Sequence, residues 1–296
     1  MKIFDCFMYF DEEIVLDLRL NTLNDYVDHF VIVESRYNHK GDKRDLKFNI
    51  DKFQKFKNKI IYLVYDQEPK KIEQIFEKDS EAMKSKKYIF NAAYRENGQR
   101  NFIQMGLKKA NNNDLILISD VDEIPNLVKL DLKTIREKII FFQQDMFYYK
   151  FNLQLPDLIW VGTRACKKKN LISPQWLRNI KDKKYPFFRI ETIFSKTKYN
   201  NVKFVKNGGW HFTNIKSPKE IELKLKSYLH HREFDVNPLS AAQIEKIINE
   251  KKAIYDLTVD KKIKKIGNGN KLEKCDLKKL PSYIIHNLEK FRMWLD

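Results

Sequence analysis

The sequence predicts an α/β protein with a mainly parallel central sheet flanked by helices, and three observations support this class. The first half of the 296-residue chain alternates short apolar runs with amphipathic stretches, as strands and helices alternate in βαβ units. The run Leu115–Ile118 is apolar throughout, which is typical of a central strand buried on both faces. A composition of 43% hydrophobic and 13% aromatic residues is that of a globular chain with a large core.

The N-terminal half is expected to contain four strands, each a short apolar run, separated by helical stretches. One helix is expected at 11–23. A long polar segment at 70–110 is expected to be mostly helical before the chain breaks at Asn111–Asn113. The four strands are expected at 2–8, 29–33, 60–64 and 115–118.

The C-terminal half is expected to begin with strands and to return to helices. The strands after residue 180 are expected to be antiparallel, and Gly267 and Gly269 mark a loop in the lysine-rich segment 261–279. The expected strands are 139–153, 158–163, 187–195 and 202–205. The expected helices are 218–229, 240–257 and 281–294.

The chain is strongly basic, with 57 Lys and Arg against 40 Asp and Glu and a formal charge of +17. This charge attracts polyanions, phosphorylated ligands or an anionic membrane, although an AT-rich codon bias toward Lys, Asn and Ile produces the same excess. The lysines are spread along the chain, and the sequence contains no recognisable nucleic-acid-binding module. No nucleic-acid partner is therefore expected.

Cysteine usage and hydropathy predict the compartment. Cys6, Cys166 and Cys275 form an odd count without a close pair, so neither a disulfide framework nor a zinc ribbon is indicated. No window approaches the roughly 20 apolar residues that span a bilayer. We expect a cytoplasmic protein, soluble or peripheral to a membrane.

An acidic turn directly follows the buried strand 115–118. Asp120 and Asp122 are two residues apart, so in extended geometry they point the same way, at the sheet edge where open α/β sheets bind ligands. Two hard oxygen donors suit Mn²⁺ or Mg²⁺, and Glu123 is a candidate supporting group. The alternative is a solvated turn in which Pro125 opens the next helix.

Two stretches together carry a family resemblance. Ile118–Pro125, with the sequence Ile-Ser-Asp-Val-Asp-Glu-Ile-Pro, and Gly208–Phe212, with Gly-Gly-Trp-His-Phe, resemble glycosyltransferase family 17. Its best-known members are β-1,4-mannosyl-glycoprotein β-1,4-N-acetylglucosaminyltransferases. Leu18–Leu20, Val31–Ser35 and Leu46–Phe48 also match, so the resemblance covers nearly the whole chain.

The resemblance implies a GT-A type nucleotide-sugar transferase fold with a D-x-D motif, and an inverting transfer from UDP-N-acetylglucosamine to a glycan acceptor with Mn²⁺ as the usual cation. It assigns Asp120 and Asp122 to the metal and the diphosphate, and Glu34 to a nucleotide or structural contact. We expect one domain over 1–296. Its expected parts are a nucleotide-sugar-binding half at 1–125, an acceptor half at 126–260, and a basic segment with a closing helix at 261–296.

The Gly-Gly-Trp-His-Phe stretch is expected to complete the site. Gly208 and Gly209 tolerate unusual dihedral angles, as if the backbone passed close to a ligand. His211 is a candidate third metal ligand, and Trp210 is a candidate surface for the sugar. The alternative is a β-bulge with a buried tryptophan and a hydrogen-bonded core histidine.

Inversion requires a base that takes the proton of the acceptor hydroxyl. Glu233 and Asp235 follow a predicted helix, and Glu191 lies on a predicted strand; all three are candidates, although a charge cluster at a helix end is usually a solvated face. Arg95 and Arg100 are candidate partners for phosphate or ribose, with surface salt bridges as the alternative.

Two other functions fit parts of the pattern. A nucleotidyltransferase acting on sugar phosphates also uses aspartates for Mg²⁺, but it needs a glycine-rich loop after the first strand, and Phe7–Asp11 contains no glycine. A carbohydrate-binding protein without catalysis is the second alternative. Peripheral contact with an anionic membrane is expected to use Lys261, Lys262, Lys264 and Lys265.

Overall fold

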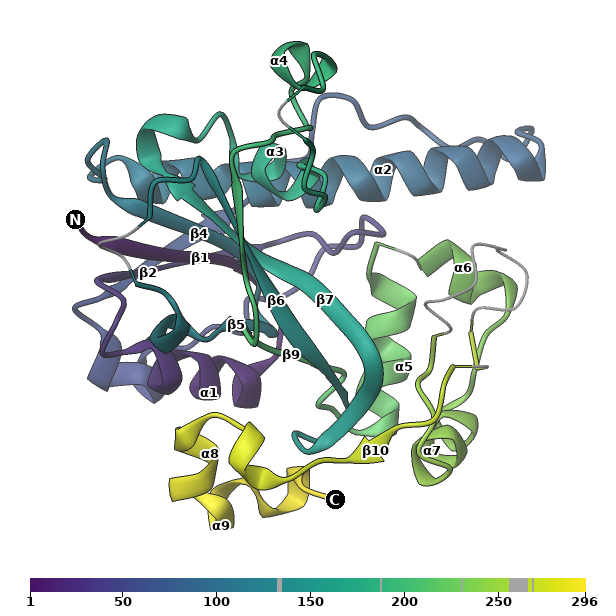
Figure 1. Ribbon diagram of the computed structural model, residues 1–296. Coiled ribbons are helices and arrows are strands. Elements are labelled where there is room, and N and C mark those ends of the chain that lie inside the picture. Colours follow the sequence, from purple (N-terminus) through teal and green to yellow (C-terminus); the bar gives the residue numbers. More distant parts are fainter. Residues whose placement is uncertain (132–134, 187, 230, 256–265, 268) are drawn as a thin grey trace.

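The computed structural model describes residues 1–131, 135–186, 188–229, 231–255, 266–267 and 269–296. In this part of the chain, one curled sheet of ten strands forms the centre of the molecule, with helices packed against it (Figure 1). The main path through the sheet has the strand order β3-β2-β1-β4-β7-β6-β9-β5. The predicted α/β class with a central sheet is confirmed.

The N-terminal half forms the parallel side of the sheet. β1 (Ile3–Tyr9), β2 (His29–Ser35), β3 (Ile60–Tyr65) and β4 (Leu115–Asp120) pair in parallel, with β1 between β2 and β4. All four predicted strands are present. β1, β2 and β4 are almost fully buried, which explains why they are apolar runs without alternation.

The second half of the sheet is mixed. β7 runs antiparallel to β4 and β6, β5 runs antiparallel to β9, and β6 runs parallel to β9. Two short strands extend the sheet sideways, β8 beside β6 and β10 beside β7. The bounds are Glu123–Pro125 for β5, Ile139–Tyr148 for β6, Leu153–Lys167 for β7, Val202–Val205 for β8, Gly209–Thr213 for β9 and Glu273–Lys274 for β10.

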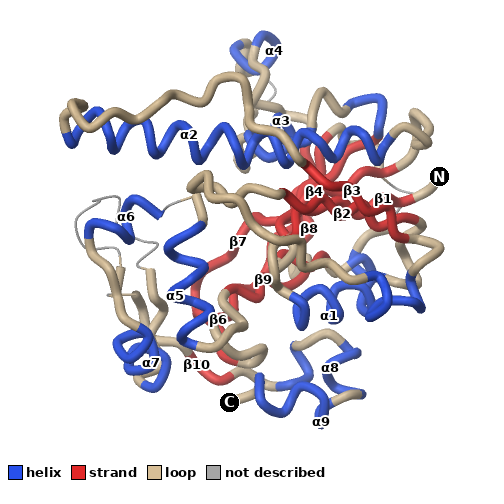
Figure 2. Tube along the Cα trace, turned by 180° about the vertical axis from the view of Figure 1, so that it is seen from behind, coloured by secondary structure: helices blue, strands red, loops and turns tan. Residues whose placement is uncertain are grey.

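Helices cover both faces of the parallel side (Figures 1 and 2). α1 (Glu13–Leu23) lies on one face and packs with the C-terminal helices α8 (Ser282–His286) and α9 (Leu288–Phe291) around one apolar core. α2 (Glu81–Phe102) and α3 (Pro174–Asn179) lie on the other face, over a second core. The sheet is therefore the middle of three layers.

A third group of helices packs beside the far ends of β6 and β7. α5 (Pro218–Ser227), α6 (His231–Val236) and α7 (Ala241–Asn249) bury apolar side chains against Tyr148 and Leu155. The remaining short helices are α4 (Glu191–Phe194) and the 3₁₀ turns η1 (Ile50–Phe56), η2 (Ile103–Leu107), η3 (Leu127–Lys129), η4 (Lys168–Asn170), η5 (Leu277–Lys279) and η6 (Arg292–Trp294).

The structure corrects several sequence-based expectations. Residues 187–195 were expected to form a strand, but the side chains of Phe188, Ile190 and Phe194 are exposed and the described part of the segment ends in the helix α4. β8 pairs with β6 in parallel rather than antiparallel. The closing helix expected at 281–294 is divided into α8, α9 and η6.

Other boundaries moved by several residues. The strand expected at 139–153 ends at Tyr148, and β7 is longer than the expected 158–163. The helical part of 70–110 begins at Glu81, where the Ser80 side chain accepts a hydrogen bond from the Met83 N–H and caps α2. Asn249 ends α7 before the predicted boundary at 257.

None of the helices in the described part of the chain is long and apolar enough to cross a lipid bilayer. The lysines proposed for membrane contact, Lys261, Lys262, Lys264 and Lys265, lie outside the described residues.

Candidate functional site

A cavity of about 370 Å³ lies at the carboxyl ends of the parallel strands. Its wall includes Tyr9 and Ser35 from the ends of β1 and β2, and the acidic turn from Asp120 to Asp122 after β4. Open α/β sheets bind ligands at this edge, and the volume is suited to a small-molecule ligand. The turn predicted to carry the chemistry therefore faces a cavity, as a ligand site requires.

A buried arginine from α1 holds the acidic turn in place. The Nη1 atom of Arg19 donates hydrogen bonds to the carbonyl oxygens of Asp120, Val121 and Glu123, at 3.1, 3.2 and 2.8 Å. Its other nitrogens donate to the Asp5 carboxylate at 2.8 and 2.6 Å and to the Ser119 hydroxyl at 2.6 Å. Because Arg19 is fully buried, these contacts fix where the turn points.

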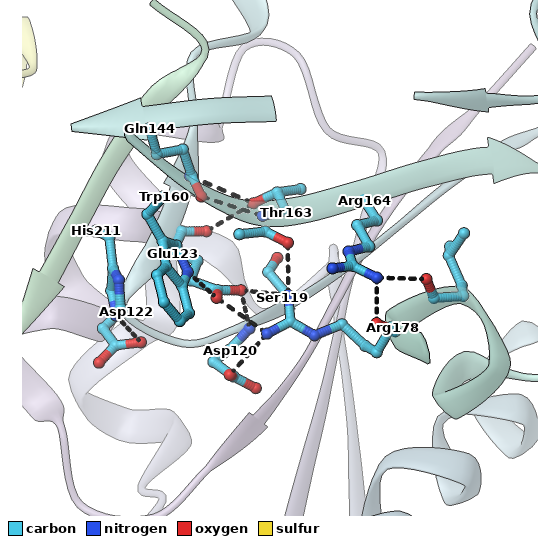
Figure 3. Close-up of polar contacts among 12 residues, drawn as sticks. Ser119, Asp120, Asp122, Glu123, Gln144, Trp160, Thr163, Arg164, Arg178 and His211 are labelled. Carbon is cyan, nitrogen blue, oxygen red and sulfur yellow. Dashed lines mark hydrogen bonds and ion pairs between the residues drawn. The ribbon is translucent and has the colours of Figure 1, made fainter. Parts of the chain in front are cut away.

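Glu123 is fully buried and accepts hydrogen bonds from several directions (Figure 3). Trp160 Nε1 donates at 2.7 Å, Arg178 donates from two nitrogens at 2.7 and 3.0 Å, and the Asp120 N–H donates at 2.9 Å. Its carboxylate joins the turn to β7 and α3. These hydrogen bonds help to fix the acidic turn, and the role of Glu123 as a supporting group of a metal site stays a prediction.

Asp120 lies between two arginines. Arg100 donates to one carboxylate oxygen at 2.9 Å and Arg178 to the other at 3.0 Å. Burial by itself would raise the pKa of Asp120, but the positive charges of Arg178 and Arg100 outweigh it and hold the pKa well below the usual range. Asp120 is therefore ionised at neutral pH, with both of its oxygens already engaged.

Asp122 has a different environment and faces His211. His211 Nε2 lies 3.5 Å from one Asp122 oxygen, and Lys224 Nζ lies 4.0 Å from the other. Burial disfavours the charged form of both side chains, but the attraction between them is stronger. His211 and then Lys224 lower the pKa of Asp122, while Asp122 raises the pKa of His211. Within the described residues, His211 Nδ1 is buried without a hydrogen-bond partner.

The cavity wall offers only a partial set of ligands for a divalent cation. No group of three or more His, Cys, Asp and Glu side chains among the described residues is arranged to hold a metal. Asp122 and His211 offer one hard oxygen and one imidazole nitrogen at the cavity wall, a partial donor set that leaves positions for ligand oxygens. Asp120 fits less well, because its oxygens bind Arg100 and Arg178.

Strand pairing joins the two sequence motifs. β5 and β9 are antiparallel neighbours, with Glu123 opposite His211 and Ile124 opposite Trp210. Gly209 has a φ of +134°, and a Cβ at this position would lie 2.1 Å from the Ile124 carbonyl oxygen. The glycine predicted to let the backbone approach a ligand instead lets β9 approach β5.

Comparison with models of known protein families gives a match over the whole chain. The model of glycosyltransferase family 17 matches residues 1–296. The chain belongs to glycosyltransferase family 17. It is therefore a glycosyltransferase, with a sugar donor and a glycan acceptor in the general sense, and the resemblance carried by the two motifs is confirmed. No curated protein matches the chain significantly.

In this family 17 transferase, the side chains of Trp210 and Glu34 are held by contacts within the protein. Trp210 belongs to the apolar core, and its Nε1 donates to the Lys279 carbonyl oxygen at 2.7 Å, which favours the buried-tryptophan alternative over a sugar-facing surface. Glu34 is fully buried and accepts from the N–H groups of Lys47 and Phe48 at 2.7 and 3.0 Å. It also accepts from Tyr62 Oη at 2.8 Å and pairs with Arg44 at 2.9 Å.

The two predicted arginines have different roles in the transferase. Arg100 reaches the acidic turn and also pairs with Glu96 at 2.7 Å. Arg95 pairs with Glu68 at 2.9 Å and donates to the carbonyl oxygens of His39 and Lys40, so it braces a loop of the cavity wall. Arg100 thus lies next to the site, whereas Arg95 supports it indirectly.

The predicted bases are not among the described residues that line the cavity. Of the described residues that form its wall, none is Glu191, Glu233 or Asp235. Glu191 is on α4 and forms ion pairs with Arg189 and Lys198, and the other two are on α6.

Two glutamates that the sequence analysis did not single out do line the cavity, Glu12 and Glu96. Glu96 pairs with Arg100, and a search for glutamate four residues before arginine on a helix finds this pair. Glu12 follows the end of β1, and its Oε2 accepts from the N–H groups of Phe10 and Asp11 at 3.2 and 3.1 Å. A carboxylate just beyond a predicted parallel strand was the available signal for Glu12.

Proposed function

We propose that this transferase moves N-acetylglucosamine from a UDP-sugar to a glycan hydroxyl, with inversion, and that Asp122 and His211 hold the Mn²⁺ or Mg²⁺ that assists the reaction. The observation that carries the proposal is the Asp122–His211 pair in the wall of a cavity at the carboxyl ends of the parallel strands. When bound, the cation neutralises negative charge that develops on the departing diphosphate.

Positively charged side chains in fixed positions are also suited to neutralise the charge on the departing diphosphate. Arg44 and Lys224 line the cavity, and Lys224 Nζ lies 4.0 Å from Asp122. Preorganised cations at the place where negative charge develops stabilise the transition state without reorganising. Asp120, fixed by Arg100 and Arg178, then shapes the turn and orients the donor more than it binds the metal.

Glu12 is the residue that we propose as base. It lines the donor cavity and also a second cavity of about 540 Å³, whose wall includes Phe53 and Trp294. We assign the second cavity to the acceptor, because aromatic and polar side chains together suit a sugar. The acceptor hydroxyl oxygen attacks the anomeric carbon, its proton passes to Glu12, and UDP leaves with the electrons of the broken glycosidic bond.

The test is release of UDP by the purified protein with UDP-N-acetylglucosamine, Mn²⁺ and a panel of glycan acceptors. Asp122→Asn preserves size and is expected to lower kcat/KM by about 100-fold or more, since the metal loses its anionic ligand. Glu12→Gln is expected to lower kcat by about 100-fold while UDP-sugar binding persists. Asp25→Asn, at an exposed carboxylate, is the matched control and should keep full activity.

Each part of the proposal has its own refuting result. Equal turnover in excess EDTA would refute the metal. Full activity of Glu12→Gln would remove Glu12 as base and leave the donor site intact. Retention of the anomeric configuration in the product, read by NMR, would contradict inversion.

A further inference from the structure

Three large apolar side chains lie exposed within seven residues around α4. Phe188, Ile190 and Phe194 are 67%, 69% and 83% exposed. A single exposed apolar residue on a protein surface needs no explanation, but a contiguous group marks a site of interaction. We call residues 181–186 and 188–198 the docking segment.

The docking segment projects from the body of the protein. In both views α4 stands out at one end of the molecule, beyond α3 and on the side of the sheet covered by α2 (Figures 1 and 2). A flat surface can therefore contact the exposed apolar residues without contacting the sheet or the helices on the opposite face of the sheet.

Basic residues flank these apolar residues in the sequence. The docking segment contains only two acidic residues, Asp182 and Glu191, and Glu191 is already paired with Arg189 and Lys198. Its basic residues are Lys181, Lys183, Lys184, Arg189, Lys196 and Lys198. Apolar side chains that enter the acyl boundary, with cations at the level of phosphate groups, are the pattern of an interfacial membrane contact.

We propose that the docking segment binds the surface of an anionic lipid bilayer, with Phe188, Ile190 and Phe194 inserted among the headgroups and the lysines against lipid phosphates. Charge complementarity selects this occupant over an uncharged apolar partner. This contact differs from the one expected from the sequence, which used the lysine-rich segment 261–279. The proposal does not depend on the proposed transfer reaction.

The docking segment also adjoins the functional site. It follows α3, which ends at Asn179 and carries Arg178, the residue that binds Asp120 and Glu123. Docking would hold the acidic turn at a set distance from the lipid surface. The transferase and an acceptor glycan attached to a lipid headgroup would then encounter each other by diffusion along the membrane surface rather than through the solution.

The test is co-sedimentation of the full chain with vesicles of phosphatidylcholine alone or mixed with phosphatidylglycerol. Binding is expected for the mixed vesicles and is expected to fall as salt is raised. The triple variant Phe188→Ser, Ile190→Ser, Phe194→Ser should lower the partition coefficient by about tenfold or more. Lys183→Glu with Lys184→Glu should lower it by a similar factor.

Matched variants elsewhere on the surface serve as controls. Val128, Ile159 and Met293 are 68%, 54% and 80% exposed, and replacing them with serine should leave binding unchanged. Lys70→Glu with Lys71→Glu changes the net charge equally and should lower binding much less than the change at Lys183 and Lys184.

Several results would overturn the proposal. One is equal binding by the wild type and the triple serine variant, when circular dichroism shows that both are folded. Another is a loss of binding only when Lys261, Lys262, Lys264 and Lys265 are neutralised. Dimers of the wild type that the serine variant abolishes, seen by light scattering without any vesicle binding, would show that a second copy covers the segment.

Discussion

Arg19→Lys tests whether one buried guanidinium organises the acidic turn. The substitution keeps the positive charge beside Asp5 and most of the aliphatic stem, so it isolates the effect of the planar fork. In the wild type the fork donates to Asp5 twice, to Ser119, and to the carbonyl oxygens of Asp120, Val121 and Glu123.

The expected magnitude follows from these hydrogen bonds. A lysine ammonium has three N–H donors, so three of the six hydrogen bonds that Arg19 makes are lost at best. Each acceptor left without a donor in this buried site costs about 1 kcal/mol or more. We expect the free energy of unfolding to fall by about 3 kcal/mol, and donor binding to weaken because the turn is less well fixed.

Urea denaturation followed by circular dichroism measures the first effect, and calorimetric titration with UDP-N-acetylglucosamine measures the second. The control is Arg36→Lys, because Arg36 pairs with Asp66 at 3.4 Å on a partly exposed surface and should contribute less than about 0.5 kcal/mol. An Arg19→Lys protein within about 0.5 kcal/mol of the wild type, with unchanged donor affinity, would refute the reasoning.

Two further predictions concern stability. Burial lowers the pKa of His231 from 6.5 to about 4, so its protonation favours the unfolded chain. Its contribution to stability is fully present well above pH 6.5 and should fall by about 2 kcal/mol between pH 7 and pH 5, measured as the difference between urea titrations of the wild type and of His231→Leu. Gly209→Ala adds a Cβ 2.1 Å from the Ile124 carbonyl oxygen at a φ of +134° and should destabilise the protein by about 3 kcal/mol. Gly267→Ala, at a φ of +85° with no neighbour nearer than 4.0 Å among the described residues, should show only the strain of about 1 kcal/mol. Equal melting temperatures of the two alanine variants would contradict the close approach of β9 to β5.

The predicted strands of the parallel half were confirmed, because burial on both faces imposes a continuous apolar run that can be read locally. The strand expected at residues 187–195 was wrong. Apolar residues in a short segment indicate side chains that prefer burial, but the sequence does not show whether the sheet has a free edge at that point, and Phe188 and Phe194 are exposed in the structure. The family motifs were recognisable, whereas their pairing as β5 and β9 was not, because two short strands far apart in the chain leave no local signal for each other.

The sequence by itself determined the α/β class, the acidic turn after the buried strand β4, and membership of a glycosyltransferase family. Only the tertiary structure decided how Asp120 and Asp122 differ. Arg100 from α2 and Arg178 from α3 converge on Asp120, while His211 from β9 faces Asp122. The two carboxylates are two residues apart in one turn, so their spacing predicts equal roles, but the charges around each come from elements that meet only when the chain is folded.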